Sequence, residues 1–388
     1  MQHLKPSNAA YAADAIYKIR SNNEADDGIR GLNNTFKDKF VFGSGGTFKG
    51  KSGGHIIQSS SGFGAIARGV GAYENQALIA IRGTHVGMFN WFDVITDLNI
   101  GMRMSSSGNM IHAGFDKTFK SFKDQIRENF TGYNPTQVHI VGHSLGGALA
   151  TLTADWMSAS KISNPSVYTF GSPRVGSESF ARNFTHRVGE ENIHRVYHKS
   201  DPISMIPLWP FMHVPLPGSD YFIDDREMVP YGKMHAMDKY SMSVKSAVNW
   251  SSLTDARVKV KNDSKIEKWL ESDSVIATVA GPFFMIGEAI LYILKKVMKG
   301  VAITLQAGLS TALTALDIVA MAFHKAAKGA KEAAGLIKRL MMKILKVLGF
   351  AVTVTSNLTL DFIKWVLTSL TRSIYNGARQ ALYMLPKV

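Results

Sequence analysis

The chain has 388 residues, 45% of them apolar and 19% charged, a composition typical of a folded protein rather than a disordered one. It contains no cysteine, which excludes disulfides, thiolate metal sites and cysteine nucleophiles. The formal charge of +14 is uneven: residues 251–388 hold 19 Lys and Arg against 9 Asp and Glu, or +10, which leaves +4 for residues 1–250. We therefore expect two parts, residues 1–250 and a basic region over residues 251–388.

The first 20 residues lack the continuous apolar core of a secretory signal, because Pro6 and Asp14 interrupt what periodicity there is. Residues 8–20 have helical character instead. We expect a chain that stays cytoplasmic until a signal-independent route exports it to act at membranes. Residues 21–64 are polar and glycine-rich, and within them Gly43 to Gly54 predicts a loop.

Two short apolar runs, residues 65–67 and 77–81, predict paired strands around a turn near Asn75. The second run ends at Arg82-Gly83-Thr84. The backbone N–H of Thr84 follows the strand tip and is a candidate donor to an oxyanion, with a plain strand-to-loop turn as the alternative.

Residues 85–104 combine large apolar side chains with few charges. This composition predicts a lid whose apolar face covers a pocket in water, with a core helix as the alternative. The residues that we expect on the apolar face of the lid are Met88, Phe89, Trp91 and Phe92.

The most informative stretch is Gln137 to Ala150, in which a β-branched run is followed at once by Gly142-His143-Ser144-Leu145-Gly146 and then by a helical pattern. Strand, sharp turn and helix in this order predict a serine lifted above a sheet. The glycines two residues either side are needed because the turn leaves no room for a Cβ. Ser144 is therefore the candidate nucleophile, and the N–H of Leu145 at the helix start is a candidate oxyanion donor.

A second Gly-x-Ser-x-Gly match surrounds Ser52, in a stretch rich in glycine, serine and lysine. It lacks the apolar run before the serine and the helical pattern after it. We interpret Ser52 as an accidental match, so the flanking pattern and not the spacing alone identifies Ser144.

Further strands alternate with helices downstream, at residues 166–170 and 192–198, which predicts an α/β fold with a mostly parallel sheet. Asp201 directly follows the last of these strands. An aspartate at the carboxyl edge of a parallel sheet is well placed to orient a histidine, so Asp201 is the candidate acid.

A base that follows the acid in the chain must be His213, His235 or His324. His324 belongs to the apolar, basic C-terminal region and is expected on a helix surface. His213 lies in an apparent strand, whereas His235 lies where a loop leads into a helix. A histidine on a loop reaches a serine more readily, which favours His235 over His213.

Five blocks of this sequence, in this order, resemble the class 3, fungal-type lipases, and the resemblance covers about residues 64–250. The blocks are Leu78-Ile79-Ala80-Ile81-Arg82-Gly83-Thr84, Ile111-His112-Ala113-Gly114-Phe115, Val141-Gly142-His143-Ser144-Leu145-Gly146-Gly147-Ala148-Leu149-Ala150, Tyr168-Thr169-Phe170-Gly171-Ser172-Pro173-Arg174-Val175-Gly176 and His198-Lys199-Ser200-Asp201-Pro202.

The resemblance implies an α/β-hydrolase fold, a mobile lid and action on acyl esters of lipids. We expect the reaction to require no metal or other cofactor. It implies Ser144 as nucleophile, Asp201 as acid, and the backbones of Thr84 and Leu145 as oxyanion donors. The segment from His235 to Tyr240 looks like the family's histidine block, which strengthens His235 as the base.

The C-terminal third is apolar and basic, and we expect it to be helical. Residues 301–323 are long enough to span a bilayer, yet Thr304, Gln306 and Asp317 favour a buried or interfacial helix. Over residues 331–348, at 100° per residue, the basic side chains fall in one arc and most apolar ones in the other. Apolar plus basic favours an anionic membrane over nucleic acid, with an internally packed helical bundle as the alternative.

The sequence therefore predicts a serine hydrolase of lipid carboxylic esters, most simply a phospholipase A1-like enzyme brought to membranes by its basic region. A triacylglycerol lipase, or a membrane-inserting protein with an ancillary hydrolase domain, are the alternatives. A secreted toxin, neutralised in its producer by an inhibitor or immunity protein, is the biological context that we expect.

Overall fold

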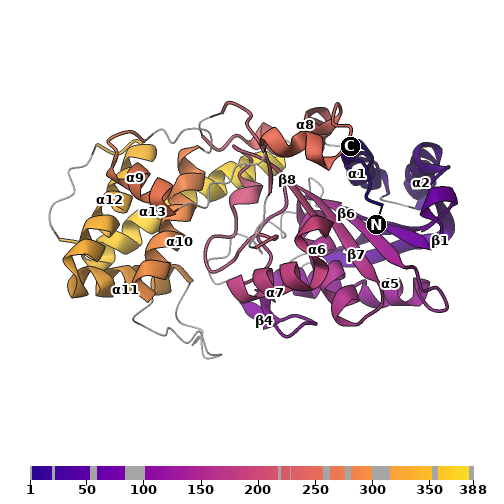
Figure 1. Ribbon diagram of the computed structural model, residues 1–388, viewed down its shortest axis with the longest axis horizontal. Helices are drawn as coiled ribbons and strands as arrows, with labels where there is room; N and C mark the ends of the chain where they lie inside the picture. The colour runs from indigo at the N-terminus through magenta and orange to yellow at the C-terminus, as the bar shows by residue number, and fades with distance from the viewer. Residues whose placement is uncertain are drawn as a thin grey trace.

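The computed structural model describes residues 2–19, 22–52, 59–83, 101–216, 220–227, 229–256, 263–275, 281–298, 315–351 and 357–383. Figure 1 shows an elongated molecule, with a part built around a sheet on the right and a helical part on the left. The predicted α/β class and the predicted C-terminal helical region are both confirmed. The helices of the helical part are α9 (Asp263–Glu271), α10 (Pro282–Met298), α11 (Ala315–Gly329), α12 (Lys331–Val347) and α13 (Leu360–Tyr383).

The main sheet has seven strands within the described residues, in the spatial order β1-β2-β3-β6-β7-β8-β9. The pairs β1-β2 and β2-β3 are antiparallel, and the four pairs from β3 to β9 are parallel. A mostly parallel sheet gathers the ends of its strands at one edge, where sites form. The seven strands are β1 (Phe40–Ser52), β2 (Ser59–Gly69), β3 (Gln76–Ile81), β6 (Gln137–His143), β7 (Asn164–Phe170), β8 (Ile193–His198) and β9 (Tyr221–Ile223), and β4 (Met102–Met104) pairs separately with β5 (Met110–His112).

Helices cover both faces of this sheet, and strand β3 shows why. Its residues Ala77, Ile79 and Ile81 belong to the core under one set of helices, whereas Leu78 and Ala80 belong to the core under the other. Side chains alternate along a strand, so an unbroken apolar run places apolar groups on both faces. One face carries α4 (Ala113–Lys120), α5 (Lys123–Asn129), α6 (Leu145–Ala159) and α7 (Glu178–Val188), and the other carries α1 (Pro6–Ala15) and α8 (Met237–Val244), with α2 (Asn22–Phe36) near β1.

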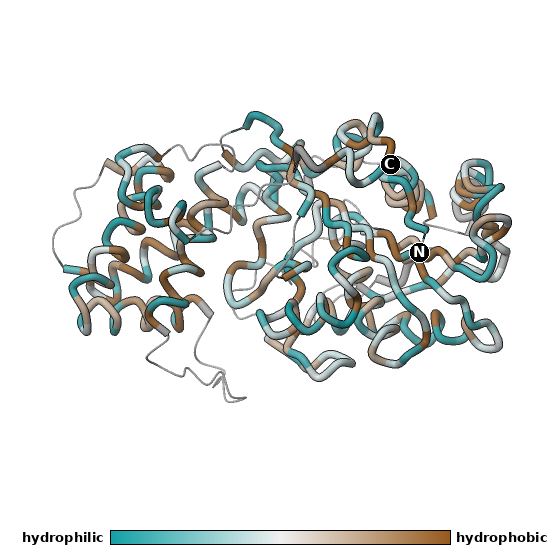
Figure 2. Tube along the Cα trace, in the orientation of Figure 1, coloured by the Kyte–Doolittle hydropathy of each residue, from teal (hydrophilic) through white to brown (hydrophobic). Residues whose placement is uncertain are grey.

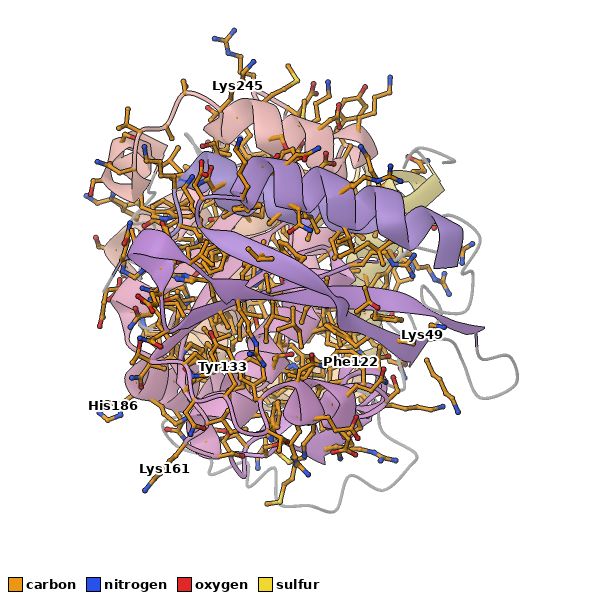
Figure 3. The ribbon with its side chains drawn as sticks, turned by 90° about the vertical axis from the view of Figure 1, so that its right-hand side faces the viewer. Lys49, Phe122, Tyr133, Lys161, His186 and Lys245 are labelled. Atoms are coloured by element: carbon orange, nitrogen blue, oxygen red, sulfur yellow. The ribbon has the colours of Figure 1, made fainter. Side chains whose placement is uncertain are left out.

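The prediction of a loop over Gly43 to Gly54 is wrong, because most of this stretch belongs to β1, which pairs with β2 through two register shifts. The glycines make room for rings. A Cβ on Gly50 would lie 2.8 Å from Phe63 and 3.0 Å from Phe122. Figure 3 shows Phe122 close to Lys49 of this strand. Between Gly43 and Ser52 the strand has one apolar side chain of its own, Phe48, so this stretch has no apolar alternation to detect.

In the helical part, the apolar arc of α12 packs inside the bundle. Its buried residues belong to one continuous core with α9, α10, α11 and α13. Figure 2 shows hydrophobic and hydrophilic residues alternating along these helices. Four basic residues of α12 are exposed, and the fifth, Lys343, is buried and donates to Ser272 and to the carbonyl of Ser274. The exposed four are Lys331, Lys338, Arg339 and Lys346.

Among the described residues, we find no helix with the length and apolarity that crossing a bilayer requires. Residues 301–314, most of the segment discussed above as a possible span, lie outside the described residues, and α11 begins at Ala315.

Candidate active site

Ser144 lies at the tight turn between β6 and α6 with φ 57° and ψ −129°, in the left-handed range that non-glycine residues rarely adopt. The turn is as crowded as the sequence predicted. A Cβ on Gly142 would lie 2.1 Å from the carbonyl oxygen of Gly146, and one on Gly146 would lie 2.2 Å from that of Ile81. The backbone of this turn is thus held by packing that only glycine permits.

Ser144, His235 and Asp201 meet at the carboxyl edge of the sheet. The Nε2 atom of His235 is 2.9 Å from Oγ of Ser144, and its Nδ1 atom is 2.9 Å from Oδ2 of Asp201. All three side chains are buried. Because a carboxylate only accepts hydrogen bonds, Nδ1 of His235 carries the proton, which leaves Nε2 free to accept from the serine hydroxyl. Ser144 follows β6, Asp201 follows β8, and His235 ends the short helix Gly232–His235 after β9.

The carboxylate of Asp201 is held by three donors. Tyr240 donates its hydroxyl to Oδ2 at 2.6 Å, beside His235, and the N–H of Ile203 donates to Oδ1 at 2.8 Å. Burial alone would raise the pKa of Asp201, but the His235 charge and these hydrogen bonds outweigh it, so the pKa lies below its ordinary value. Asp201 is therefore ionised when it faces the imidazole.

Gly171 closes the site from behind, with φ +54°. A Cβ there would lie 2.6 Å from Oδ2 of Asp201 and 3.0 Å from Nδ1 of His235. We expect Gly171→Ala to lower kcat by about 100-fold, because displacements of the order of 1 Å misalign reacting groups by that much. Ester hydrolysis under saturating substrate measures this.

Gly108 provides the matched control, since its φ is +77° and no atom lies within 4 Å of its Cβ position. Gly108→Ala carries the same backbone strain without the clash, and its kcat should equal that of the wild type. Equal losses in both variants would contradict the explanation.

Two buried histidines hold the segment that bears His235. His198 donates from Nδ1 to the carbonyl oxygen of Met234, and His143 donates from Nε2 to that of His235, both at 2.7 Å. Nδ1 of His143 then accepts from the Tyr17 hydroxyl, also at 2.7 Å. Burial lowers the pKa of His143 to about 3, so this imidazole is neutral. Sequence reasoning missed this network because its members lie far apart in the chain.

Stability should fall as the pH falls below about 6.5, because the pKa values of His139 and His143 are both lowered to about 3 by burial. The unfolded chain binds these protons near pH 6.5 and the folded chain does not, so the free energy of unfolding decreases by about 1.4 kcal/mol per pH unit for each histidine. Urea unfolding at pH 6, 5 and 4 measures the slope. In His139→Leu the slope should be shallower by about that amount, and an unchanged slope would refute the assignment.

Of the predicted oxyanion donors, Leu145 begins α6, where backbone N–H groups have no acceptor within the helix. Thr84 lies outside the described residues, as do the predicted lid residues Met88, Phe89, Trp91 and Phe92. The residue before Thr84 is described. A Cβ on Gly83 would lie 3.1 Å from Cβ of Ser144, so the segment that follows β3 passes beside the candidate nucleophile.

The other candidates for the base and the nucleophile have partners other than Ser144 and Asp201. His213 bonds to the carbonyl oxygen of Ser204 and to Arg195, and His324 bonds through Nδ1 to the carbonyl oxygen of Leu358. Ser52 is the last residue of β1, where it pairs with Ser59. None of these contacts involves Ser144 or Asp201.

A serine on a glycine-flanked turn, facing a histidine and an aspartate at the edge of a mostly parallel sheet, is the arrangement of serine hydrolases with the α/β-hydrolase fold. Residues 78–211 match the family model described as "Lipase (class 3)". The resemblance to the class 3 lipases that the five sequence blocks indicated is confirmed, over residues 78–211.

Two curated relatives match segments of 161 and 155 residues. The chain is 33% identical over 161 residues to the secreted mono- and diacylglycerol lipase 1 of Fusarium solani, covering 40% of this chain and 46% of the relative. It is 34% identical over 155 residues to the chloroplastic phospholipase A(1) DAD1 of Arabidopsis thaliana, covering 34% of each. The chain thus spans less than half the length of these curated relatives.

Among solved structures, the chain is similar to the lipase from Rhizopus microsporus var. chinensis, with 26% identity and a TM-score of 0.42 over 56% of this chain and 73% of that one. It is also similar to the LIP2 lipase of Yarrowia lipolytica, with 19% identity and a TM-score of 0.43 over 56% and 78%.

Proposed function

We propose that the protein hydrolyses carboxylic esters of lipids, with Ser144, His235 and Asp201 as its catalytic residues. The observation that carries the proposal is the continuous chain of hydrogen bonds from the serine hydroxyl through the imidazole to an ionised carboxylate. The class 3 lipase match over residues 78–211 supports a lipid ester as the substrate.

In the proposed reaction, Nε2 of His235 takes the hydroxyl proton while Oγ of Ser144 attacks the acyl carbonyl carbon. The tetrahedral oxyanion receives hydrogen bonds from the N–H groups of Leu145 and Thr84. The imidazolium then gives its proton to the leaving alcohol, and a water hydrolyses the acyl-enzyme by the same route in reverse. Asp201 stabilises the imidazolium throughout.

For the substrate we propose phospholipase A1-like action on membrane phospholipids. The similarity to a protein named phospholipase A(1) supports it, as does the basic character of residues 251–388. The competing proposal is a glyceride lipase, since other relatives are named mono- and diacylglycerol lipases.

Mass spectrometry of released products separates the two substrates. The purified protein is given phosphatidylglycerol vesicles whose lipids carry different chains at the two glycerol positions, or emulsified diacylglycerol and triacylglycerol. We expect release of the sn-1 fatty acid and the matching lysolipid, and no release by Ser144→Ala. Hydrolysis of glycerides alone would overturn the phospholipid proposal, and equal release by Ser144→Ala would overturn the hydrolase.

We further propose that the helical part brings the enzyme to anionic membranes. The support comes from the exposed lysines of α12 and from two exposed aromatic side chains, Phe350 (42% exposed) and Trp365 (44% exposed), whose rings lie 5.4 Å apart. Aromatic groups beside basic ones suit the boundary between headgroups and acyl chains.

Sedimentation with phosphatidylglycerol vesicles tests this association. The double variant Phe350→Ser with Trp365→Ser should bind more weakly than the wild type, while Val248→Ser, which removes a 70% exposed apolar residue of the sheet-containing part, should bind as the wild type does. Equal binding by all three proteins would contradict a docking role for the aromatic pair.

The insertion alternative differs in one result, leakage from vesicles made of ether lipids that cannot be hydrolysed. A hydrolase acting at the surface should leave them sealed.

The toxin context is tested by expression in the periplasm of a competitor, where harmless accumulation would count against it.

A further inference from the structure

Helix α13 joins the two parts of the molecule. Its first turns pack against α11 and α12, and its last turns lie against the segment Gly232–His235 and the turn Ile203–Met205. Figure 1 shows α13 in yellow, running from the helical part toward the sheet-containing part. The two segments that it meets there adjoin Asp201 and contain His235.

The contact is close because the residues involved are small. The Cβ position of Gly377 is 3.2 Å from Cβ of Pro230 and 3.5 Å from Cβ of Pro202, so this one residue lies against the prolines that shortly precede both segments. One turn later, a Cβ on Gly232 would lie 2.6 Å from both the backbone nitrogen and Cα of Ala381.

The two segments are also tied to each other. The N–H of Tyr231 donates to the carbonyl oxygen of Ser200 at 2.9 Å, one residue before Asp201. A shift of Pro230 or Pro202 would therefore move the backbone on both sides of the His235–Asp201 hydrogen bond.

We infer that the last turns of α13, through Gly377 and Ala381, are a positioning element for His235 and Asp201. This inference rests on the proposed function. The family match ends at residue 211, so this contact is made by a part of the chain outside the matched segment. The C-terminal region thus sets the distance between base and acid in addition to any role at a membrane.

A size series at residue 377, with a short soluble ester as substrate, tests the inference apart from membrane binding. We expect Gly377→Leu to lower kcat by about 100-fold, since a side chain of that size must displace Pro230 or Pro202 by an ångström or more. KM should stay within about twofold of the wild-type value, because the expected change is in the alignment of His235 and Asp201 and not in the binding of the ester. Gly377→Ala should lose less, since a Cβ needs only a small shift of its neighbour.

The matched control is Ala320→Leu, which enlarges a buried residue of α11 away from these segments. Thermal unfolding should show destabilisation in both leucine variants, with kcat lowered only at residue 377. The acidic limb of the kcat–pH profile should also shift in Gly377→Leu, because the His235–Asp201 hydrogen bond is altered, and not in Ala320→Leu.

Circular dichroism measures the folded fraction of each variant, and kcat is calculated for that fraction. If Gly377→Leu does not fold, Gly377→Ala is the variant that tests the inference. Equal kcat values and equal pH profiles in the residue-377 variants and the control would overturn the inference. Absence of Ser144-dependent hydrolysis in the wild type would instead refute the proposed function, so the two failures are distinguishable.

Discussion

Ser144→Ala is expected to lower kcat for ester hydrolysis by about a million-fold, the loss typical of removing a nucleophile from a serine triad. Without Oγ, His235 has no group to deprotonate, and the hydrogen bond of 2.9 Å to the imidazole is lost. Assays at high enzyme concentration, quenched at fixed times, measure the residual rate of Ser144→Ala. Circular dichroism verifies that this variant is folded.

The chain supplies its own control in Ser52, the serine of the second Gly-x-Ser-x-Gly match. Ser52→Ala should retain the wild-type kcat, because this serine ends an antiparallel strand rather than a strand-to-helix turn. Loss of activity in Ser52→Ala with retention in Ser144→Ala would reverse the assignment.

Asp201→Asn is the second large effect, with an expected loss in kcat of about ten-thousand-fold. The carboxylate accepts from His235 and Tyr240 on one oxygen and from Ile203 on the other. An amide has one oxygen, so its NH₂ must face a donor in either orientation. When the NH₂ faces Nδ1, the imidazole proton moves to Nε2, which can no longer accept from Ser144.

Asp155→Asn is the matched control, because Asp155 is likewise buried and pairs with Arg187, away from the three residues. Both variants should be less stable to heat, and only Asp201→Asn should lose kcat. A pH–rate profile distinguishes the two further, since the wild-type shape should survive in Asp155→Asn. Comparable losses of kcat would show that Asp201 acts through stability alone.

Local pattern was sufficient to predict the serine turn and the parallel strands. The β-branched run before Gly142 and the helical pattern after Gly146 lie within 14 consecutive residues. Strand β3 is an unbroken apolar run, and its residues are buried on both faces of the sheet as such a run predicts. Asp201 could be chosen because it directly follows a strand. His235 needed both its loop context and the family resemblance.

The supporting contacts could not be predicted, because they join distant residues. Tyr17 reaches His143 across 126 positions, and His143 reaches the carbonyl of His235 across 92. Strand β1 escaped detection for a different reason: between Gly43 and Ser52 it has one apolar side chain of its own, Phe48, and its glycines leave room for the rings of Phe63 and Phe122. The close approach of α13 to another backbone depends on two small residues four apart, Gly377 and Ala381, whose partners are likewise distant in the chain.

In the helical part, periodicity identified the two arcs of α12 and could not say what each would face. The apolar arc is buried inside the bundle. Of the basic arc, Lys343 is also buried, and its ammonium group donates to the carbonyl oxygen of Ser272, just after α9. A helix that can present an apolar face to lipid can also present it to other helices, and the sequence alone does not distinguish the two environments.

The α13 contact forms late in synthesis, because α13 lies close to the C-terminal end of the sequence. Roughly 150 residues separate His235 from Ala381, and synthesis at about 5–20 residues per second takes roughly 7 to 30 s to add them. Throughout that interval the nascent chain already contains Ser144, Asp201 and His235 but not the surface against which Pro202, Pro230 and Gly232 pack. A partly translated chain therefore lacks the packing partner of the loops that bear its candidate catalytic residues.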